Sequence, residues 1–178
     1  MSDSCLPGPD AASAPHGTCM AFDYGSRRIG VAVGETLTGT TQPLSIVGNT
    51  NGTPDWQSID KLLAEWQPVL LVVGWPLTVS GEEQDITAHV RGFIKKLVSR
   101  TALPVFAADE RFSSMAAQTE LKRQRSSGQR RRKTSHADVD TLAAALILEN
   151  WFKKRVAKKR SLHTDKLHAP SPPDTSNR

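Results

Sequence analysis

Residues 20–35, MAFDYGSRRIGVAVGE, decide the fold. An apolar segment over 19–23 predicts a strand that ends at Asp23, and a turn with one glycine and two arginines leads into a second strand over 28–35. Asp and Gly are common turn residues, so Asp23 has a simple structural explanation. The alternative is that a carboxylate at the end of a buried strand binds a metal ion. Acidic residues elsewhere in the chain bear on this choice.

The rest of the pattern predicts a mixed α/β fold. In the second strand Ile29, Val31 and Val33 point the same way, which is typical of a half-buried strand. Thr53 is expected to cap a helix that has Pro54 at its first position. After the second strand, the predicted elements are a strand over 40–48, a helix between 53 and 68, a strand over 69–74, a helix around 86–97, a strand over 104–110, a helix from 113 or 114, and a last helix over 136–152. This order predicts a mixed five-stranded sheet, in which an antiparallel three-stranded meander precedes parallel strands, with helices on both faces.

One domain is expected in the 178 residues, with a tail at each end. Residues 18–153 are predicted to fold, while the Ser-, Pro- and Ala-rich segment 1–17 and the basic segment 154–178 are predicted to be disordered. No apolar run reaches the roughly 20 residues that span a bilayer, and the N-terminus has no features of a secretory signal. Two cysteines indicate neither a disulfide framework nor a zinc site, so we expect a cytoplasmic protein without membrane association.

Basic residues are concentrated in two segments of the chain. The segments 122–133 and 153–166 each contain seven Lys or Arg residues, whereas the remaining residues include nine basic and 17 acidic ones. Concentrated positive charge on an acidic body favours a polyanionic partner, most simply nucleic acid. The plain alternatives are a solvated loop and a solvated tail.

Acidic residues from three distant segments are candidates for a shared site. Asp23 ends the first strand, and Asp109 and Glu110 end the last one. Because side chains alternate between the two faces of a strand, only one of Asp109 and Glu110 can join Asp23. At the start of the last helix, Asp138 fits a capping pattern. Asp140 lies beyond the first turn and beside the buried face, where an unpaired carboxylate is costly. A metal or a basic partner would relieve that cost.

A cluster of carboxylates predicts a divalent cation, because the negative charges repel one another without one. Hard oxygen ligands suit Mg²⁺ or Mn²⁺. Two such ions about 4 Å apart serve phosphodiester hydrolysis, one at the attacking water and the other at the leaving oxygen. The residues therefore favour a nuclease with two metal ions.

Four sequence blocks resemble the YqgF family, also called RuvX, a bacterial branch of the RNase H-like superfamily. They are AFDYGSRRIGVAVGE (21–35), VVGWPLTVSG (72–81), DERFSS (109–114) and VDTLAAALILENWF (139–152). The resemblance covers roughly residues 18–152. It implies an RNase H-like fold and a catalytic, metal-binding trio formed by Asp23, Glu110 and Asp140. It also implies a nuclease that processes the 5′ end of pre-16S ribosomal RNA, or alternatively a Holliday junction resolvase.

Basic residues near the trio are the expected nucleic-acid contacts. The resemblance extends to a flexible basic loop before the last helix, although its arginine-rich content here departs from the family pattern. Trp75, in the turn after a strand, is expected either to stack on a base or to pack in the interior. The predicted phosphate-binding residues are Arg27, Arg28, Arg111, Lys122, Arg123, Arg125, Arg130, Arg131, Arg132 and Lys133.

Two other functions fit parts of the sequence. The 23–35 segment also resembles the first phosphate loop of actin-like ATPases and sugar kinases, but those proteins close two such domains over ATP. A non-catalytic nucleic-acid-binding module with a relic site is the second alternative. A junction resolvase needs two sites and therefore a symmetric dimer, so a monomer or a homodimer is expected.

Overall fold

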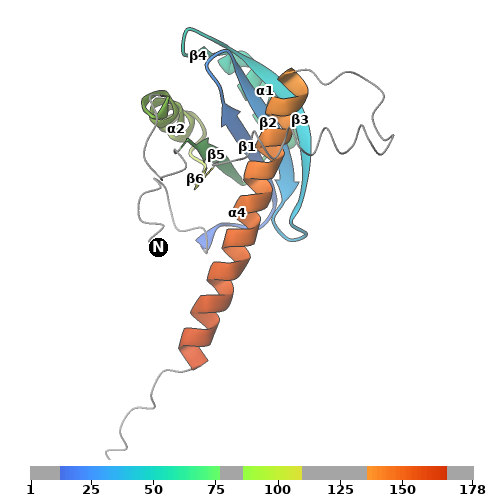
Figure 1. Ribbon diagram of the computed structural model, residues 1–178, viewed down its shortest axis with the longest axis vertical. Coiled ribbons are helices and arrows are strands. Elements are labelled where there is room, and N and C mark those ends of the chain that lie inside the picture. Colours follow the sequence, from blue (N-terminus) through green and yellow to red (C-terminus); the bar gives the residue numbers. More distant parts are fainter. Residues whose placement is uncertain (1–12, 77–85, 110–135, 168–178) are drawn as a thin grey trace, which may run out of the picture.

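The computed structural model describes residues 13–76, 86–109 and 136–167, with side chains described for the last segment over 138–158. Its centre is a six-stranded sheet with the strand order β4-β3-β2-β1-β5-β6 (Figure 1). Strands β1 to β4 pair antiparallel, and β5 and β6 continue the sheet parallel to β1. The strands are β1 (Thr18–Tyr24), β2 (Arg28–Glu35), β3 (Thr40–Thr50), β4 (Thr53–Pro54), β5 (Leu70–Trp75) and β6 (Val105–Asp109).

Helices cover both faces of this sheet, as the sequence predicts. On one face α1 (Trp56–Trp66) and α2 (Thr87–Thr101) bury residues such as Ile59 and Phe93 against Phe22 and its neighbours. On the other face α4 (His136–Leu167) lies across the strands and packs Ile147 and Trp151 against Ala21 (Figure 1). Burial of the unbroken apolar strand β5 on both faces explains its composition.

The two faces of β2 differ in side-chain size. Ile29, Val31 and Val33 belong to the core beneath α1 and α2. Gly30, Ala32 and Gly34 alternate with them and therefore face α4. A Cβ atom on Gly30 would overlap the backbone carbonyl of Asp140, and one on Gly34 would lie 2.9 Å from Leu148 Cδ2. The prediction that β2 is half-buried is wrong. Its small residues let α4 pack closely against the face that was expected to meet solvent.

Two predicted boundaries differ from the structure around Thr53. Thr53 and Pro54 form β4, a sixth strand paired with β3, so the predicted count of five is one short. Asn51 and Gly52 have positive φ values of 50° and 75°, which produce the tight hairpin turn between these strands. Helix α1 begins after Asp55, whose side chain accepts a hydrogen bond from the Ser58 amide and so acts as the cap.

Both ends of the chain contain ordered residues beyond the predicted bounds of the domain, 18–153. Helix α4 continues to Leu167, so residues 154–167 are helical within the predicted tail, as their many strong helix formers allow. At the other end Ala14 is buried, and its carbonyl oxygen accepts a hydrogen bond from Arg155 Nη2 at 2.7 Å. The Arg155 guanidinium lies 5.6 Å from the centre of the Trp151 ring. Within the parts of the chain that the structure describes, no helix is long and apolar enough to cross a membrane.

Burial of Cys19 in β1 predicts a pH-dependent stability. Burial, assisted by the Glu35 carboxylate, raises the pKa of the Cys19 thiol from 9.0 to about 12. Above about pH 9 the unfolded chain loses this proton and the native chain keeps it, so the free energy of unfolding falls by up to ~1.4 kcal/mol per pH unit. Urea denaturation near pH 8 and near pH 10 should show a steeper loss for the wild type than for Cys19→Ala. Equal losses would show that Cys19 does not titrate in this way.

Candidate active site

The fold brings Asp23 and Asp140 to the same place on the sheet. In β1, Asp23 lies between Phe22 and Tyr24, which both pack beneath α2, so the Asp23 side chain faces α4. Asp23 pairs with Gly30 of β2, and Gly30 touches the backbone of Asp140. Two carboxylates separated by more than 100 residues in sequence therefore share one side of the sheet at the end of β1.

Asp140 already has a basic partner in the structure. Arg28, the first residue of β2, donates from Nε to Asp140 Oδ2 at 2.9 Å. The side chains are 43% and 29% exposed, so solvent screens the pair and its contribution to stability is small.

Asp109, the last residue of β6, lies on the opposite face of the sheet from Asp23. Ala108 packs in the core under α4, whereas Asp109, which pairs with Trp75 of β5, projects to the other face. Asp109 is therefore not the acid that joins Asp23. Glu110, the predicted third member of the trio, lies outside the described residues.

Several other predicted contacts also lie outside the described segments. Arg27 and Arg28 are described and exposed, in and after the turn between β1 and β2. The remaining predicted phosphate contacts, and the helix expected from 113 or 114, lie in the segment 110–135, which is not described: Arg111, Lys122, Arg123, Arg125, Arg130, Arg131, Arg132 and Lys133. Trp75 is 1% exposed and packs in the core. The alternative that it packs in the interior is therefore confirmed, and the alternative that it stacks on a base is wrong.

The donor chemistry at the end of β1 suits a hard divalent cation. Two carboxylates on one side of the sheet supply oxygen ligands of the kind that Mg²⁺ and Mn²⁺ prefer. Within the described ranges no three His, Cys, Asp or Glu side chains form a group that could hold a metal. A complete ligand set therefore requires a residue from elsewhere, and Glu110 is the predicted one.

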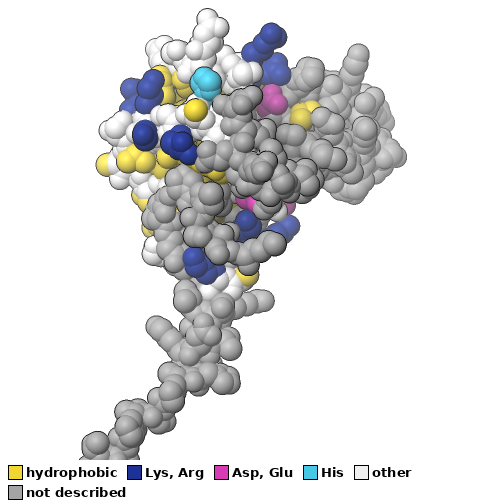
Figure 2. Space-filling model, turned by 60° about the vertical axis from the view of Figure 1, so that its left-hand side comes forward, with side chains coloured by type: hydrophobic (Ala, Val, Ile, Leu, Met, Phe, Trp, Pro, Cys, Tyr) yellow, Lys and Arg dark blue, Asp and Glu magenta, His cyan; other side chains and the backbone are white. Residues whose placement is uncertain are grey.

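A basic surface on α2 is absent from the sequence-based predictions. Arg91, Lys95, Lys96 and Arg100 are all exposed on this helix, which contains no acidic residue. Figure 2 shows this side of the molecule, on which Lys and Arg side chains lie at several places and acidic ones at fewer. The sequence contained a signal for this surface, because the spacing of the four residues places them on the side of the helix away from its apolar stripe.

Comparisons with known proteins identify relatives along most of the chain. A family described as "RuvX: Holliday junction resolvase" matches residues 17–154. A protein of Edwardsiella ictaluri named "Putative pre-16S rRNA nuclease" is 43% identical over 138 residues, which cover 78% of this chain and 96% of the relative. A protein of the same name from Yersinia enterocolitica is 44% identical over 135 residues, covering 76% and 94%.

A solved structure also shares the fold. The crystal structure of the yeast mitochondrial Holliday junction resolvase matches with a TM-score of 0.55, covering 89% of this chain and 88% of that chain. The two sequences are only 11% identical, so this similarity concerns the RNase H-like arrangement of strands and helices alone.

Proposed function

This chain belongs to the RuvX family, and from this membership we infer that it is a nuclease that processes the immature end of pre-16S ribosomal RNA. The observation that supports catalysis at the end of β1 is the approach of Asp140 to Asp23 across Gly30. RNA is the preferred substrate because relatives named as pre-16S rRNA nucleases match at 43–44% identity over nearly their whole length.

We propose that Asp23, Glu110 and Asp140 hold one or two Mg²⁺ or Mn²⁺ ions. When bound there, the metal supplies Lewis-acid chemistry that acidifies an attacking water and neutralises charge on the phosphodiester. Asp23 is suited to anchoring because β1 is a central strand, paired on both sides by β2 and β5. Arg28 balances the Asp140 charge and lies where it can donate to a phosphate oxygen.

The basic segment 122–133 is proposed to bind the sugar–phosphate backbone without reading its sequence. Replacing Arg130, Arg131 and Arg132 together by Ala should weaken RNA binding and reduce the slope of log affinity against log salt by about two units. Fluorescence anisotropy over a series of salt concentrations measures this slope. The control Lys61→Ala removes an exposed positive charge from α1 and should leave the slope unchanged. An unchanged slope in the triple variant would exclude this segment from the binding surface.

A direct comparison of substrates tests the proposed function. Purified protein is incubated with a pre-16S ribosomal RNA fragment containing the immature end and with a four-way DNA junction, each with Mg²⁺ and with Mn²⁺. Metal-dependent cleavage of the RNA, abolished by EDTA, is the expected result. Cleavage of the junction alone would replace this proposal by junction resolution, and cleavage of neither substrate would contradict both.

A further inference from the structure

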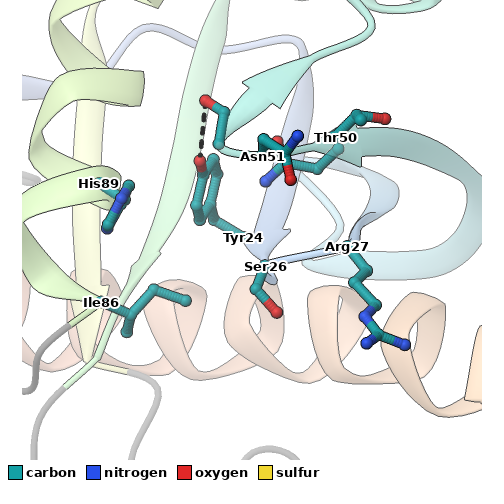
Figure 3. A pocket seen from close by; sticks show the side chains of 9 residues that line it. Tyr24, Ser26, Arg27, Thr50, Asn51, Ile86 and His89 are labelled. Carbon is teal, nitrogen blue, oxygen red and sulfur yellow. Dashed lines mark hydrogen bonds between the residues drawn. The ribbon is translucent and has the colours of Figure 1, made fainter.

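A cavity opens on the α2 side of the sheet, at the same edge as Asp23. Its volume is about 740 Å³, within the range of small-ligand sites. The end of β1, the β1–β2 turn, the β3–β4 hairpin and the start of α2 form its walls (Figure 3). The side chains that line it offer hydroxyl, amide, imidazole and guanidinium groups, and none of the described lining residues is acidic. Such a wall suits a ligand that combines hydrogen-bonding edges with a negative charge.

Asn49 provides an unsatisfied hydrogen-bond acceptor in this wall. The residue is 4% exposed, and its Nδ2 donates to the Gly25 carbonyl oxygen at 2.7 Å, which ties the β1–β2 turn to β3. Its Oδ1 is buried and has no hydrogen-bond partner in the described part of the chain. A buried acceptor without a partner costs about 1–3 kcal/mol, and its burial keeps it from direct contact with a molecule in the cavity. Asn49 therefore shapes this wall by holding the β1–β2 turn against β3.

Two ring side chains, those of Tyr24 and His89, also line the cavity. The Tyr24 hydroxyl donates to the Gly52 carbonyl oxygen at 3.5 Å, and the exposed His89 ring lies beside the same glycine (Figure 3). Both residues also line a neighbouring cavity of about 220 Å³, which Trp56 and Phe93 help to form. Tyr24 is buried and its ring packs against Phe93, so the exposed His89 ring is the flat surface against which an unpaired base can lie.

Charge and position connect the cavity to the proposed active site. Arg27 lines the cavity and is exposed in the turn before β2. His89 lies on α2, on which Arg91, Lys95 and Lys96 are also exposed, while Arg100 pairs with Asp60 of α1. Tyr24 follows Asp23 directly, so the two side chains lie on opposite faces at the end of one strand. A single-stranded nucleic acid that passes over this edge of the sheet can therefore contact both the cavity and Asp23.

We propose that this cavity binds an unpaired nucleotide of the substrate strand, next to the nucleotides at the cleavage site. This proposal rests on the proposed nuclease function, since it assigns a substrate position to that site. The base lies against the exposed His89 ring, the exposed Thr50 and Asn51 side chains offer it hydrogen bonds, and Arg27 contacts the phosphate. The protein therefore prefers RNA with an unpaired segment at the processing site over a continuous duplex.

The test uses binding without cleavage, in the full chain carrying Asp23→Asn and without divalent metal. The probes are a labelled single-stranded RNA of roughly 12 nucleotides and the blunt duplex of the same sequence. Asn51→Asp adds a carboxylate to the cavity and keeps the positive φ of 50°, which both residues tolerate. Asn51→Asp should raise the Kd for the single-stranded RNA about tenfold through charge repulsion, and His89→Ala should raise it about tenfold through lost stacking. Both variants should change the duplex affinity by less than about twofold.

The matched control is Gln57→Glu, which adds one negative charge to an exposed position of α1 outside the cavity. It should leave both affinities within about twofold. The proposal is overturned if Asn51→Asp and His89→Ala resemble this control, or if they weaken single-strand and duplex binding equally. Competition by adenosine 5′-monophosphate as strong as that by the RNA would assign the cavity to a free nucleotide and overturn the proposal as well.

The outcomes for the cavity and for the nuclease remain separable. If the wild type cleaves RNA but the cavity variants bind normally, only the cavity proposal is lost. If the variants lose single-strand binding but the wild type cleaves no substrate with Mg²⁺ or Mn²⁺, only the nuclease proposal is lost.

Discussion

Asp23→Asn is expected to lower kcat for RNA cleavage at least ~10³-fold, a loss of about 4 kcal/mol in transition-state stabilisation. The reason is that Asn keeps the shape of the side chain but removes the charge that is proposed to hold a divalent cation at the end of β1. RNA affinity without metal should change less than about threefold, because the phosphate contacts are proposed for Arg and Lys residues. Single-turnover cleavage assays together with anisotropy titrations separate these two effects.

Asp60→Asn is a suitable control for this experiment. Asp60 is an exposed residue of α1 that forms an ion pair with Arg100, so its replacement should cost at most about 1 kcal/mol of stability and no activity. Equal activity in the wild type and Asp23→Asn would mean that cleavage arises elsewhere. In the same assay Glu110→Gln should abolish cleavage and Asp109→Asn should not, since Asp109 faces away from α4.

Gly30→Ala should produce the largest loss of stability among single-methyl substitutions in the sheet. Its Cβ would overlap the Asp140 carbonyl, and neither the paired strand nor the helix backbone can move aside cheaply. We expect the free energy of unfolding to fall by about 3 kcal/mol and Tm by about 10 °C. Chemical and thermal denaturation measure both quantities.

Gly48→Ala provides the matched control, because a Cβ there meets nothing within 4 Å. It should change the free energy of unfolding by less than about 1 kcal/mol. Gly30→Ala should also reduce cleavage below the melting transition, since displacing α4 separates Asp140 from Asp23. A Gly30→Ala variant as stable and active as Gly48→Ala would refute this close approach.

A mixed sheet with an antiparallel meander followed by parallel strands, and the identity of the family, could be predicted from the sequence, and both are confirmed. Long apolar runs and caps determine such elements locally, so β2 was predicted with its observed bounds, 28–35. Short elements were missed where tertiary pairing outweighs local preference. Thr53 and Pro54 form a hairpin strand against β3, although the same two residues are typical of a helix start.

For the candidate site, the sequence predicted a trio of acids but not how Asp23 and Asp140 come together. The trio stays a prediction as a whole, because Glu110 is not described. The role of Gly30 could not be inferred, because it depends on which helix crosses which strand. The cavity was missed for a similar reason: Asn49, Tyr24 and His89 have no shared motif, and only the folded chain places them together.

The length of α4 limits what its far end can touch. From Asp140 to Leu167 an α-helix rises about 40 Å, so the second basic segment projects from the body as a stiff rod (Figure 1). A flexible tail could fold back toward Asp140, whereas a helix anchored by Trp151 and Arg155 cannot. If cleavage takes place at the proposed site, contacts of the outer end fall several nucleotides away from the cut bond, or on another molecule.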